Sequence, residues 1–302
     1  MPEPDGVLIL TGATGSGKTE IALQLAREFD AEIVGADSRQ IYRGMPIGTA
    51  APSAAQMTEV PHHLVGFLDP RERYSAARFT QDAMSAIRDI GRRGKRAIVT
   101  GGTGFYLRAL FGGVSLAPQH DGVLRARLAR EALLHPPNFL YEWLAQRDPN
   151  RAGAIHPGDT YRVLRALEVA LAGPSAVARP SELQTLGGDG IAWTMVFLDV
   201  PLDELDRRIA ARTARMLAAG FVDEAERIGG EAVAASAVGY PAAFAYLRGW
   251  STLDELRASL ERATKQYARR QRTWFRREPA TIWCAPEALA TLVREKLQWR
   301  AN

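Results

Sequence analysis

The chain has 302 residues, 46% of them hydrophobic, and a formal net charge of +4 from 38 basic and 34 acidic residues. This size and composition allow one large domain with its own core and a smaller one. No apolar run approaches the roughly 18 residues of a membrane-spanning helix, and the acidic residues 1–5 do not resemble a signal peptide, so we expect no membrane association. The single Cys284 excludes an internal disulfide and fits a reducing cytoplasm, where we expect a monomer.

The first third of the sequence alternates strand and helix patterns, which is typical of a parallel α/β sheet. Residues 7–11 and 31–36 are apolar or β-branched runs that predict buried strands, and residues 96–100 predict a third. Ser75 is suited to cap a helix that ends near residue 90. The Gly- and Pro-rich residues 41–52 predict an ordered surface loop.

Strand patterns disappear over residues 116–190, where helices are predicted near 122–134, 138–146 and 160–171, with Asp159 as the N-cap of the last. A strand pattern returns at 193–199, and helices are expected from Pro201 to about 219 and from 252 to 277. A short strand near 281–284 and a terminal helix complete the chain. We therefore predict a P-loop NTPase-like α/β core domain, a parallel sheet flanked by helices, formed by 1–115 and 191–302, with a helical insertion domain at 116–190.

A phosphate-loop motif separates the first strand from the first helix. It matches G-x-x-x-x-G-K-[ST] at every fixed position and consists of Gly12, Ala13, Thr14, Gly15, Ser16, Gly17, Lys18 and Thr19. The glycines allow a tight turn whose N–H groups point toward a bound anion at the helix N-terminus. Lys18 can reach outer phosphates, and the Thr19 hydroxyl is a candidate ligand of a phosphate-bound Mg²⁺. The motif predicts a diphosphate or triphosphate site without saying which.

Two further turns are expected at the same edge of the sheet, because ligands bind beyond the carboxyl ends of parallel strands. One begins with Asp37 and Ser38, and the other is Gly101-Gly102-Thr103-Gly104. Three roles are open for Asp37: a Mg²⁺ ligand as in phosphate-loop nucleotidases, a general base near the phosphate, or a residue that stabilises the turn.

Basic residues are concentrated in one predicted helix. Residues 261–277 hold seven basic side chains and one acid, a net charge of +6, so the other 285 residues sum to −2. Lys265, Arg269, Arg272 and Arg276 share one helix face, while Leu260, Ala263, Tyr267 and Trp274 lie on another. A basic stripe opposite an apolar one suits contact with a nucleic-acid backbone. A solvated helix face is the alternative.

Residues 37–50 resemble a family signature. They read D-S-R-Q-I-Y-R-G-M-P-I-G-T-A, which is similar to the D-S-x-Q-[IV]-Y-[RK]-G-[ML]-x-I-G-T-A block of tRNA dimethylallyltransferases, also called tRNA isopentenyltransferases. Further blocks agree in the same order, at residues 61–64, 74–76, 101–107, 162–168 and 270–276. The resemblance covers nearly the whole chain and is far more specific than the phosphate loop.

The resemblance implies transfer of a dimethylallyl group from its diphosphate to N6 of the adenosine just 3′ of the anticodon of tRNA. It nominates Asp37 as the general base, since the delocalised adenine amine must lose a proton as the bond forms. Lys18, Thr19, Mg²⁺ and the loop N–H groups would stabilise the diphosphate leaving group. Thr103 resembles a family threonine near the reacting amine, and Arg212 matches an arginine at the diphosphate, with a solvated helix arginine as its alternative.

The resemblance also implies tRNA contacts. They fall at Asp37, Ser38, Arg39, Gln40, Thr103, Arg125, Tyr161, Arg162, Val163, Leu164, Arg165, Gly239, Tyr240, Arg269, Arg270, Gln271, Arg272, Thr273, Trp274, Phe275 and Arg276. Gln40 is suited either to recognise the edge of the adenine or to stabilise its own loop. Pro241 departs from the Lys or Arg that is usual after the Gly-Tyr pair, which puts the contact near 236–241 in question.

Two other classes of protein remain as alternatives. An ATP-dependent small-molecule kinase would use Asp37 as a Mg²⁺ ligand and the insertion as a lid, but it has no use for the basic helix. A non-catalytic RNA-binding module leaves a complete phosphate loop beside Asp37 and Thr103 without a purpose. Both alternatives explain less of the sequence than a transferase that acts on tRNA.

Overall fold

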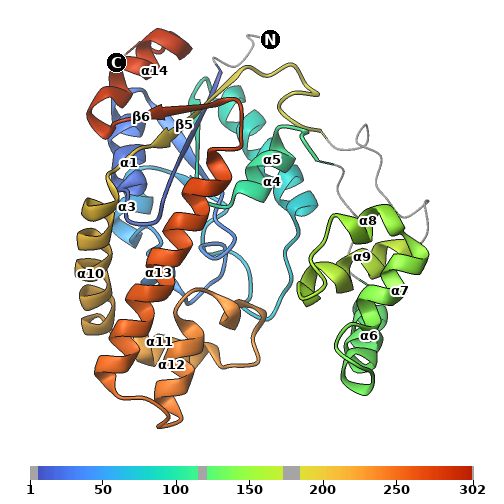
Figure 1. The fold of residues 1–302 in the computed structure, drawn as a ribbon. Coiled ribbons are helices and arrows are strands. Elements are labelled where there is room, and N and C mark those ends of the chain that lie inside the picture. The colour runs from blue at the N-terminus through green and yellow to red at the C-terminus, as the bar shows by residue number, and fades with distance from the viewer. Residues whose placement is uncertain (1–5, 115–120, 173–183, 301–302) are drawn as a thin grey trace. The chain divides into compact units, whose positions relative to one another are not determined.

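The computed structural model describes residues 6–114, 121–172 and 184–300, and the chain forms two compact units (Figure 1). The first unit comprises residues 1–112 and 184–302, and the second comprises 113–183. The second unit is shorter than the insertion predicted at 116–190, because residues 184–190 pack with the first unit. Leu186 is fully buried, its amide donates to the Leu110 carbonyl at 2.9 Å, and Asp189 forms an ion pair with Arg88.

The first unit is built on one parallel sheet. In the described residues the strands are β1 (Val7–Gly12), β2 (Ala31–Gly35), β3 (His62–His63), β4 (Arg96–Thr100), β5 (Trp193–Leu198) and β6 (Thr281–Cys284). Their order is β3-β2-β4-β1-β5-β6, and all the pairings are parallel. The predicted strands and fold class are confirmed. The two-residue β3 was not predicted, since two residues are too few to show an alternating pattern.

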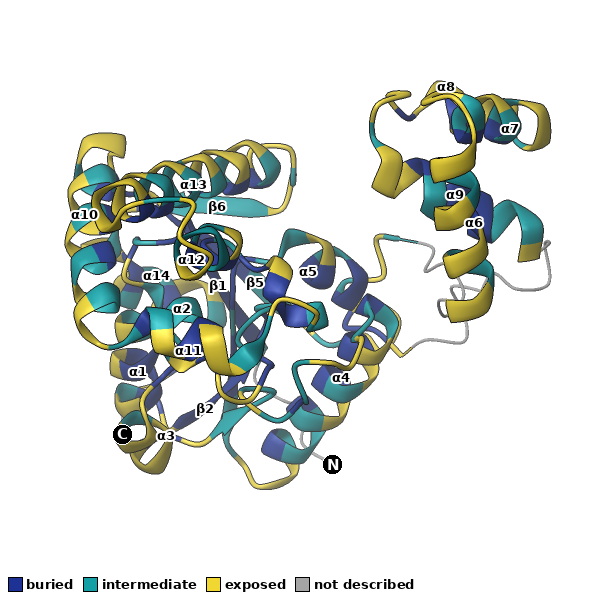
Figure 2. Cartoon of the chain, turned by 90° about the horizontal axis from the view of Figure 1, so that it is seen from below, coloured by how far each residue is buried: buried dark blue, intermediate teal, exposed yellow. Residues whose placement is uncertain are grey.

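Helices cover both faces of this sheet. The helices of the first unit, in its described residues, are α1 (Lys18–Glu28), α2 (Pro46–Thr49), α3 (Ala54–Glu59), α4 (Ala76–Arg92), α5 (Gly104–Leu110), α10 (Leu202–Ala218), α11 (Phe221–Ile228), α12 (Tyr240–Leu247), α13 (Leu253–Phe275) and α14 (Leu289–Leu297), with 3₁₀ turns η3 (Val233–Ser236) and η4 (Pro286–Ala288). Figure 2 shows β1 dark blue between helices whose outer faces are exposed, whereas β6 at the edge of the sheet is teal; β1 and β2 are buried along their whole length. Continuous burial of the strands is what a sheet covered on both faces requires.

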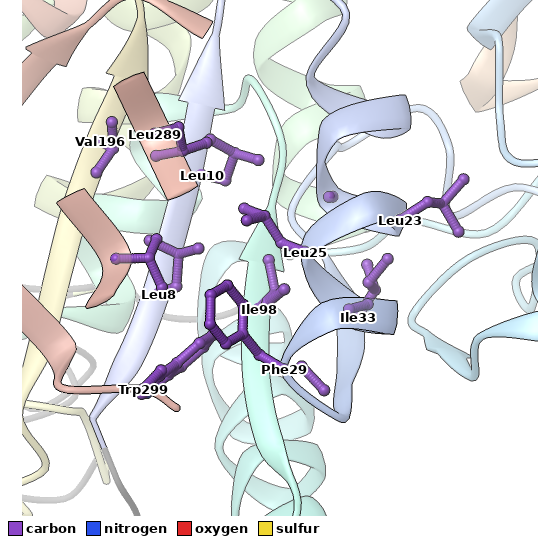
Figure 3. Packing of buried hydrophobic residues seen from close by; sticks show 14 of the residues in the cluster. Leu8, Leu10, Leu23, Leu25, Phe29, Ile33, Ile98, Val196, Leu289 and Trp299 are labelled. Carbon is purple, nitrogen blue, oxygen red and sulfur yellow. The ribbon is translucent and has the colours of Figure 1, made fainter. Parts of the chain in front are cut away.

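Alternate residues of the central strands pack against different helices, because successive side chains of a strand point to opposite faces. Leu8 and Leu10 join a core with α1 and α14, in which Phe29 and Trp299 meet edge to face at 5.8 Å (Figure 3). On the other face, Phe197 of β5 contacts Phe275 of α13 at 5.4 Å between ring centroids. The long basic helix is therefore fixed to the sheet by its carboxyl-terminal end.

The segment that was predicted to be a surface loop is partly internal. Ile41 and Met45 are buried, and Pro46–Thr49 form α2. Both side chains belong to a cluster with Phe221 of α11 and Tyr240 of α12. The prediction failed here because Gly and Pro indicate turns but do not indicate what the turns pack against.

The second unit contains α6 (Gly122–Leu134), α7 (Phe139–Arg147), α8 (Pro149–Gly153) and α9 (Thr160–Ala172). Its own small core includes Leu128, Leu144 and Leu167. The carboxylate of Asp159 accepts a hydrogen bond from the Arg162 amide at 3.1 Å, which confirms the predicted N-cap. In the parts of the chain that the structure describes, no helix is long and apolar enough to cross a membrane.

Candidate active site

The phosphate loop connects the end of β1 to the start of α1. Gly15 and Gly17 have φ angles of 86° and 87°, which are accessible mainly to glycine, and Gly17 is the N-cap of α1. The Ser16 amide donates a hydrogen bond to the Ala13 carbonyl at 3.0 Å, which closes the turn. Strand, turn and helix thus stand where the sequence predicts them, and the loop presents the N-terminus of an 11-residue helix to a bound anion.

The turns after β2 and β4 lie beside this loop, because β4 lies between β2 and β1 in the sheet. Backbone bonds continue past the strands: the Gly101 amide donates to the Leu10 carbonyl at 3.3 Å, and the Thr103 amide donates to the Ala36 carbonyl at 3.3 Å. The Thr103 hydroxyl also accepts from the Ser38 amide at 3.0 Å. Thr103 therefore joins the glycine turn to the turn that carries Asp37.

The carboxylate of Asp37 stabilises its own turn. Its Oδ1 accepts hydrogen bonds from the backbone amides of Arg39 at 2.8 Å and Gln40 at 3.4 Å. The turn-stabilising role is thus present, and it is compatible with a chemical one because it fixes the carboxylate in one orientation. The side chain of Gln40 also stabilises its loop, since its amide donates to the carbonyls of Thr49 and Ala50, each at 3.1 Å.

Two half-buried cations, Lys18 and Arg212, lie close to this carboxylate. Burial lowers the pKa of Lys18 to about 8, against the opposing effect of Asp37. Burial also lowers the pKa of Arg212, again opposed by Asp37. Arg212, on α10, donates from Nη1 to the Thr14 hydroxyl at 2.9 Å. It is therefore not a solvated helix arginine, although its role toward a diphosphate stays a prediction.

Two cavities meet at these residues. One, of about 460 Å³, is lined by the phosphate loop, including Lys18 and Thr19. The other, of about 270 Å³, lies between the Asp37 turn, η3 and α13. The residues that border both cavities are Thr14, Asp37, Thr49, Arg212 and Tyr267. A group bound at the phosphate loop and a group bound in the second cavity would therefore approach each other beside Asp37.

The sequence matches two family models, IPP transferase over residues 40–278 and Isopentenyl transferase over residues 5–67. Curated relatives include tRNA dimethylallyltransferase 1 of Pelobacter propionicus, 43% identical over 95% of both chains, and tRNA dimethylallyltransferase of Alkalilimnicola ehrlichii, 44% identical over 95% of this chain and 92% of the relative. The chain belongs to the IPP transferase family. The resemblance seen in the sequence is thereby confirmed.

Solved structures of this family share the fold. The full-length tRNA isopentenylpyrophosphate transferase of Bacillus halodurans superposes with a TM-score of 0.70, 31% identity and 97% coverage of each chain. A eukaryotic dimethylallyltransferase acting on tRNA superposes with a TM-score of 0.73 and 26% identity, covering 97% of this chain and 76% of the other.

The tRNA contacts predicted on α13 divide into an outer and an inner set. Arg269, Arg270, Thr273 and Arg276 are exposed, and Arg270 borders the second cavity. Gln271 and Phe275, in contrast, are 5% and 1% exposed. Both side chains face the protein interior, and Gln271 borders the phosphate-loop cavity, so their contacts with tRNA stay a prediction. Trp274 is half-buried against the start of α5, under the guanidinium of Arg108 at 4.5 Å.

The basic stripe of α13 is also less continuous than its spacing predicts. Arg272 binds Asp199 at 2.8 Å and the Val200 carbonyl at 3.0 Å, and Lys265 lies 3.6 Å from Asp206 of α10. These acids are distant in the sequence, so the helical spacing gave no sign of them. Within the predicted stripe, Arg269 and Arg276 stay exposed.

In the second unit, the predicted tRNA contacts surround one buried carboxylate. Glu168 is 2% exposed and binds Arg125 at 3.1 Å and Arg165 at 2.6 Å. Tyr161 is exposed and lies under the guanidinium of Arg125 at 5.1 Å. The side chain of Val163 belongs to the core of the unit, and its contact with tRNA stays a prediction. Arg162 is exposed and Leu164 half-buried.

Tyr240 is also internal, and it leads to a residue that the sequence reasoning missed. Tyr240 is fully buried and donates from its hydroxyl to Glu224 at 2.7 Å, and Gly239 is buried beside it. Their contacts with tRNA stay a prediction. Glu224 is fully buried too, and accepts the amides of Ile47 at 2.8 Å and Gly48 at 2.7 Å. Burial and this bond raise the pKa of Tyr240. The carboxylate thus fixes α2, whose carboxyl-terminal end holds Gln40.

We expect Glu224→Gln to lower the free energy of unfolding by about 1–3 kcal/mol, because an amide cannot accept from all three donors and a buried donor would stay unpaired. Tyr240→Phe is expected to lower it by about 1 kcal/mol. Urea denaturation of both single variants and of the double variant gives the coupling free energy between Glu224 and Tyr240. Glu226→Gln, an exposed change on the same helix, is the control. If the two substitutions lowered the free energy of unfolding by strictly additive amounts, the contact between Glu224 and Tyr240 would be contradicted.

Proposed function

We propose that this chain transfers the dimethylallyl group of dimethylallyl diphosphate to N6 of the adenosine on the 3′ side of the anticodon in tRNA. The observation that carries the proposal is the position of Asp37, which borders both the phosphate-loop cavity and the second cavity. Membership of the IPP transferase family, whose curated relatives are named tRNA dimethylallyltransferase, supports it.

The phosphate-loop cavity suits the diphosphate. Its lining includes Lys18 and Arg212, with Arg208 held near the loop by a 3.2 Å bond to the Ser16 carbonyl. Cations that are partly stripped of water are stabilised by an anion, and their attraction increases as negative charge develops on the departing diphosphate. The residues here would therefore stabilise the transition state more than the ground state.

The second cavity suits a flipped adenine. Apolar side chains such as Met216, Val238 and Leu260 line it with Tyr267, and Arg39 and Arg270 provide positive charge. An adenosine in an anticodon loop must leave its stack to enter such a pocket. As the N6–C bond forms, the allylic C–O bond breaks, its electron pair leaves with the diphosphate, and Asp37 accepts the N6 proton.

A magnesium ion fits the phosphate-loop cavity through Thr19. Among the described residues, no three His, Cys, Asp or Glu side chains gather into a metal site, but Mg²⁺ at phosphates is usually bound through few protein ligands, with substrate oxygens and water completing its shell. The Thr19 hydroxyl, which lines the cavity, would hold it. When bound, the ion would neutralise charge on the leaving diphosphate. We further propose that the protein works in the cytoplasm, a reducing compartment that suits its single cysteine, and that it is a monomer.

The first test supplies the protein with unmodified tRNA, Mg²⁺ and dimethylallyl diphosphate, without ATP. Nucleoside mass spectrometry should find one C5H8 unit added to adenosine, and nuclease mapping should place it beside the anticodon. Unchanged tRNA, together with consumption of ATP in the presence of a small acceptor, would overturn the proposal in favour of a kinase.

Asp37→Asn should reduce the rate of transfer by about 10²–10⁴-fold, because the amide keeps the shape of the carboxylate but cannot accept the proton. Asp37→Ala should abolish transfer. The affinity for tRNA, measured by filter binding, should stay within a few-fold of wild type in both variants. An equal loss of affinity and rate would assign Asp37 to binding instead.

The affinity for dimethylallyl diphosphate should fall as the pH rises through about 8, where the free protein loses the Lys18 ammonium. The sign follows from the lowered pKa: below it Lys18 is charged and attracts the anion, and above it binding must first restore a proton. Calorimetric titrations between pH 6.5 and 9.5 with Mg²⁺ measure this. Lys18→Arg stays charged over this range, so it should remove most of the dependence. A flat wild-type profile would contradict the role of Lys18.

A further inference from the structure

Gln271 connects two of the three turns at the active site. It lies on α13 between two arginines, yet it is only 5% exposed. Its side-chain Oε1 accepts a hydrogen bond from the Thr14 amide at 2.8 Å, and its Nε2 donates to the Gly102 carbonyl at 3.1 Å. One amide group therefore joins the phosphate loop after β1 to the glycine turn after β4.

Only an amide satisfies both contacts. The Thr14 N–H needs an acceptor and the Gly102 carbonyl needs a donor, so glutamate would lose one bond and an aliphatic side chain would lose both. Gly102 is matched to this arrangement, because a Cβ at that position would lie 2.1 Å from Nε2 of Gln271. A methyl group there would displace the amide.

Thr14 is held from a second helix as well. The Arg212 side chain of α10 donates to the Thr14 hydroxyl at 2.9 Å, while Gln271 of α13 holds the Thr14 backbone. Thr14 borders both cavities. Its position therefore sets the distance between a group on the phosphate loop and a group beside Asp37, and this distance must be exact for reaction.

We infer that Gln271 is a positioning residue of the diphosphate site, which fixes the phosphate loop against the glycine turn and takes no part in binding tRNA. Its neighbour Arg269, exposed on the same helix, is free to contact RNA. The two residues should thus have opposite phenotypes although they lie two positions apart. The role assigned to Gln271 rests on the proposed function in one respect, that the loop binds a diphosphate.

The test compares Gln271→Met, which keeps length and apolar packing but loses both bonds, with Arg269→Gln. For each protein, the dissociation constants of dimethylallyl diphosphate and of tRNA are measured separately, with the KM of each substrate. Gln271→Met should weaken diphosphate binding by about tenfold or more, because two buried hydrogen bonds that hold the phosphate loop are lost. The dissociation constant for tRNA should stay within twofold of wild type. Arg269→Gln should weaken only tRNA binding.

Gly102→Ala is an independent variant, also informative if Gln271→Met does not fold. It should weaken diphosphate binding in the same way, and the double variant should bind diphosphate no worse than either single one, because both remove the same contact. A tRNA defect in Gln271→Met with normal diphosphate binding would overturn the inference and leave the proposed function intact. Failure of the wild-type protein to bind dimethylallyl diphosphate would overturn both.

Discussion

The active site depends on the hydrogen-bonded ladder of three neighbouring parallel strands, β2, β4 and β1. Because the strands are parallel, their carboxyl ends lie at one edge of the sheet, and the chain must turn there three times. Bonds such as that from the Ala36 amide to the Thr100 carbonyl, at 2.7 Å, extend the ladder past the strands into the turns. The phosphate loop, the Asp37 turn and the glycine turn are therefore positioned by the most buried part of the fold.

Electrostatics at this edge favour an anion. Lys18 and Arg212 both have their pKa lowered by burial, and Asp37 opposes the shift in each. Two half-buried cations held near each other are costly, and a single carboxylate offsets only part of that cost. A bound diphosphate would supply the remaining negative charge. Loss of the diphosphate would restore this unfavourable arrangement, so the two cations favour the bound anion over its release.

The sequence predicts much of this, and its failures have a common physical origin. Strand patterns, the phosphate loop and caps such as Ser75 are local features, and they were confirmed. Burial by distant segments is not local. Glu224 occurs in an ordinary amphipathic helix pattern, and nothing nearby indicates that Tyr240 and α2 cover it. Arg272 looks like part of a free basic stripe until β5 brings Asp199 to it.

Helix α13 shows the same limit most clearly, and it suggests why both substrates would meet on one element. The resemblance assigns both Gln271 and Arg269 to contact with tRNA. Helical spacing puts the two on different faces of α13 but does not say which face lies against the sheet. Packing of Phe275 against Phe197 decides this, and directs Gln271 to the phosphate loop. In the proposed reaction, Arg269 on the outer face would hold RNA. Because one rigid helix would then contact both the phosphate loop and the RNA, it would fix the diphosphate and the tRNA relative to each other. This keeps N6 aligned with the allylic carbon.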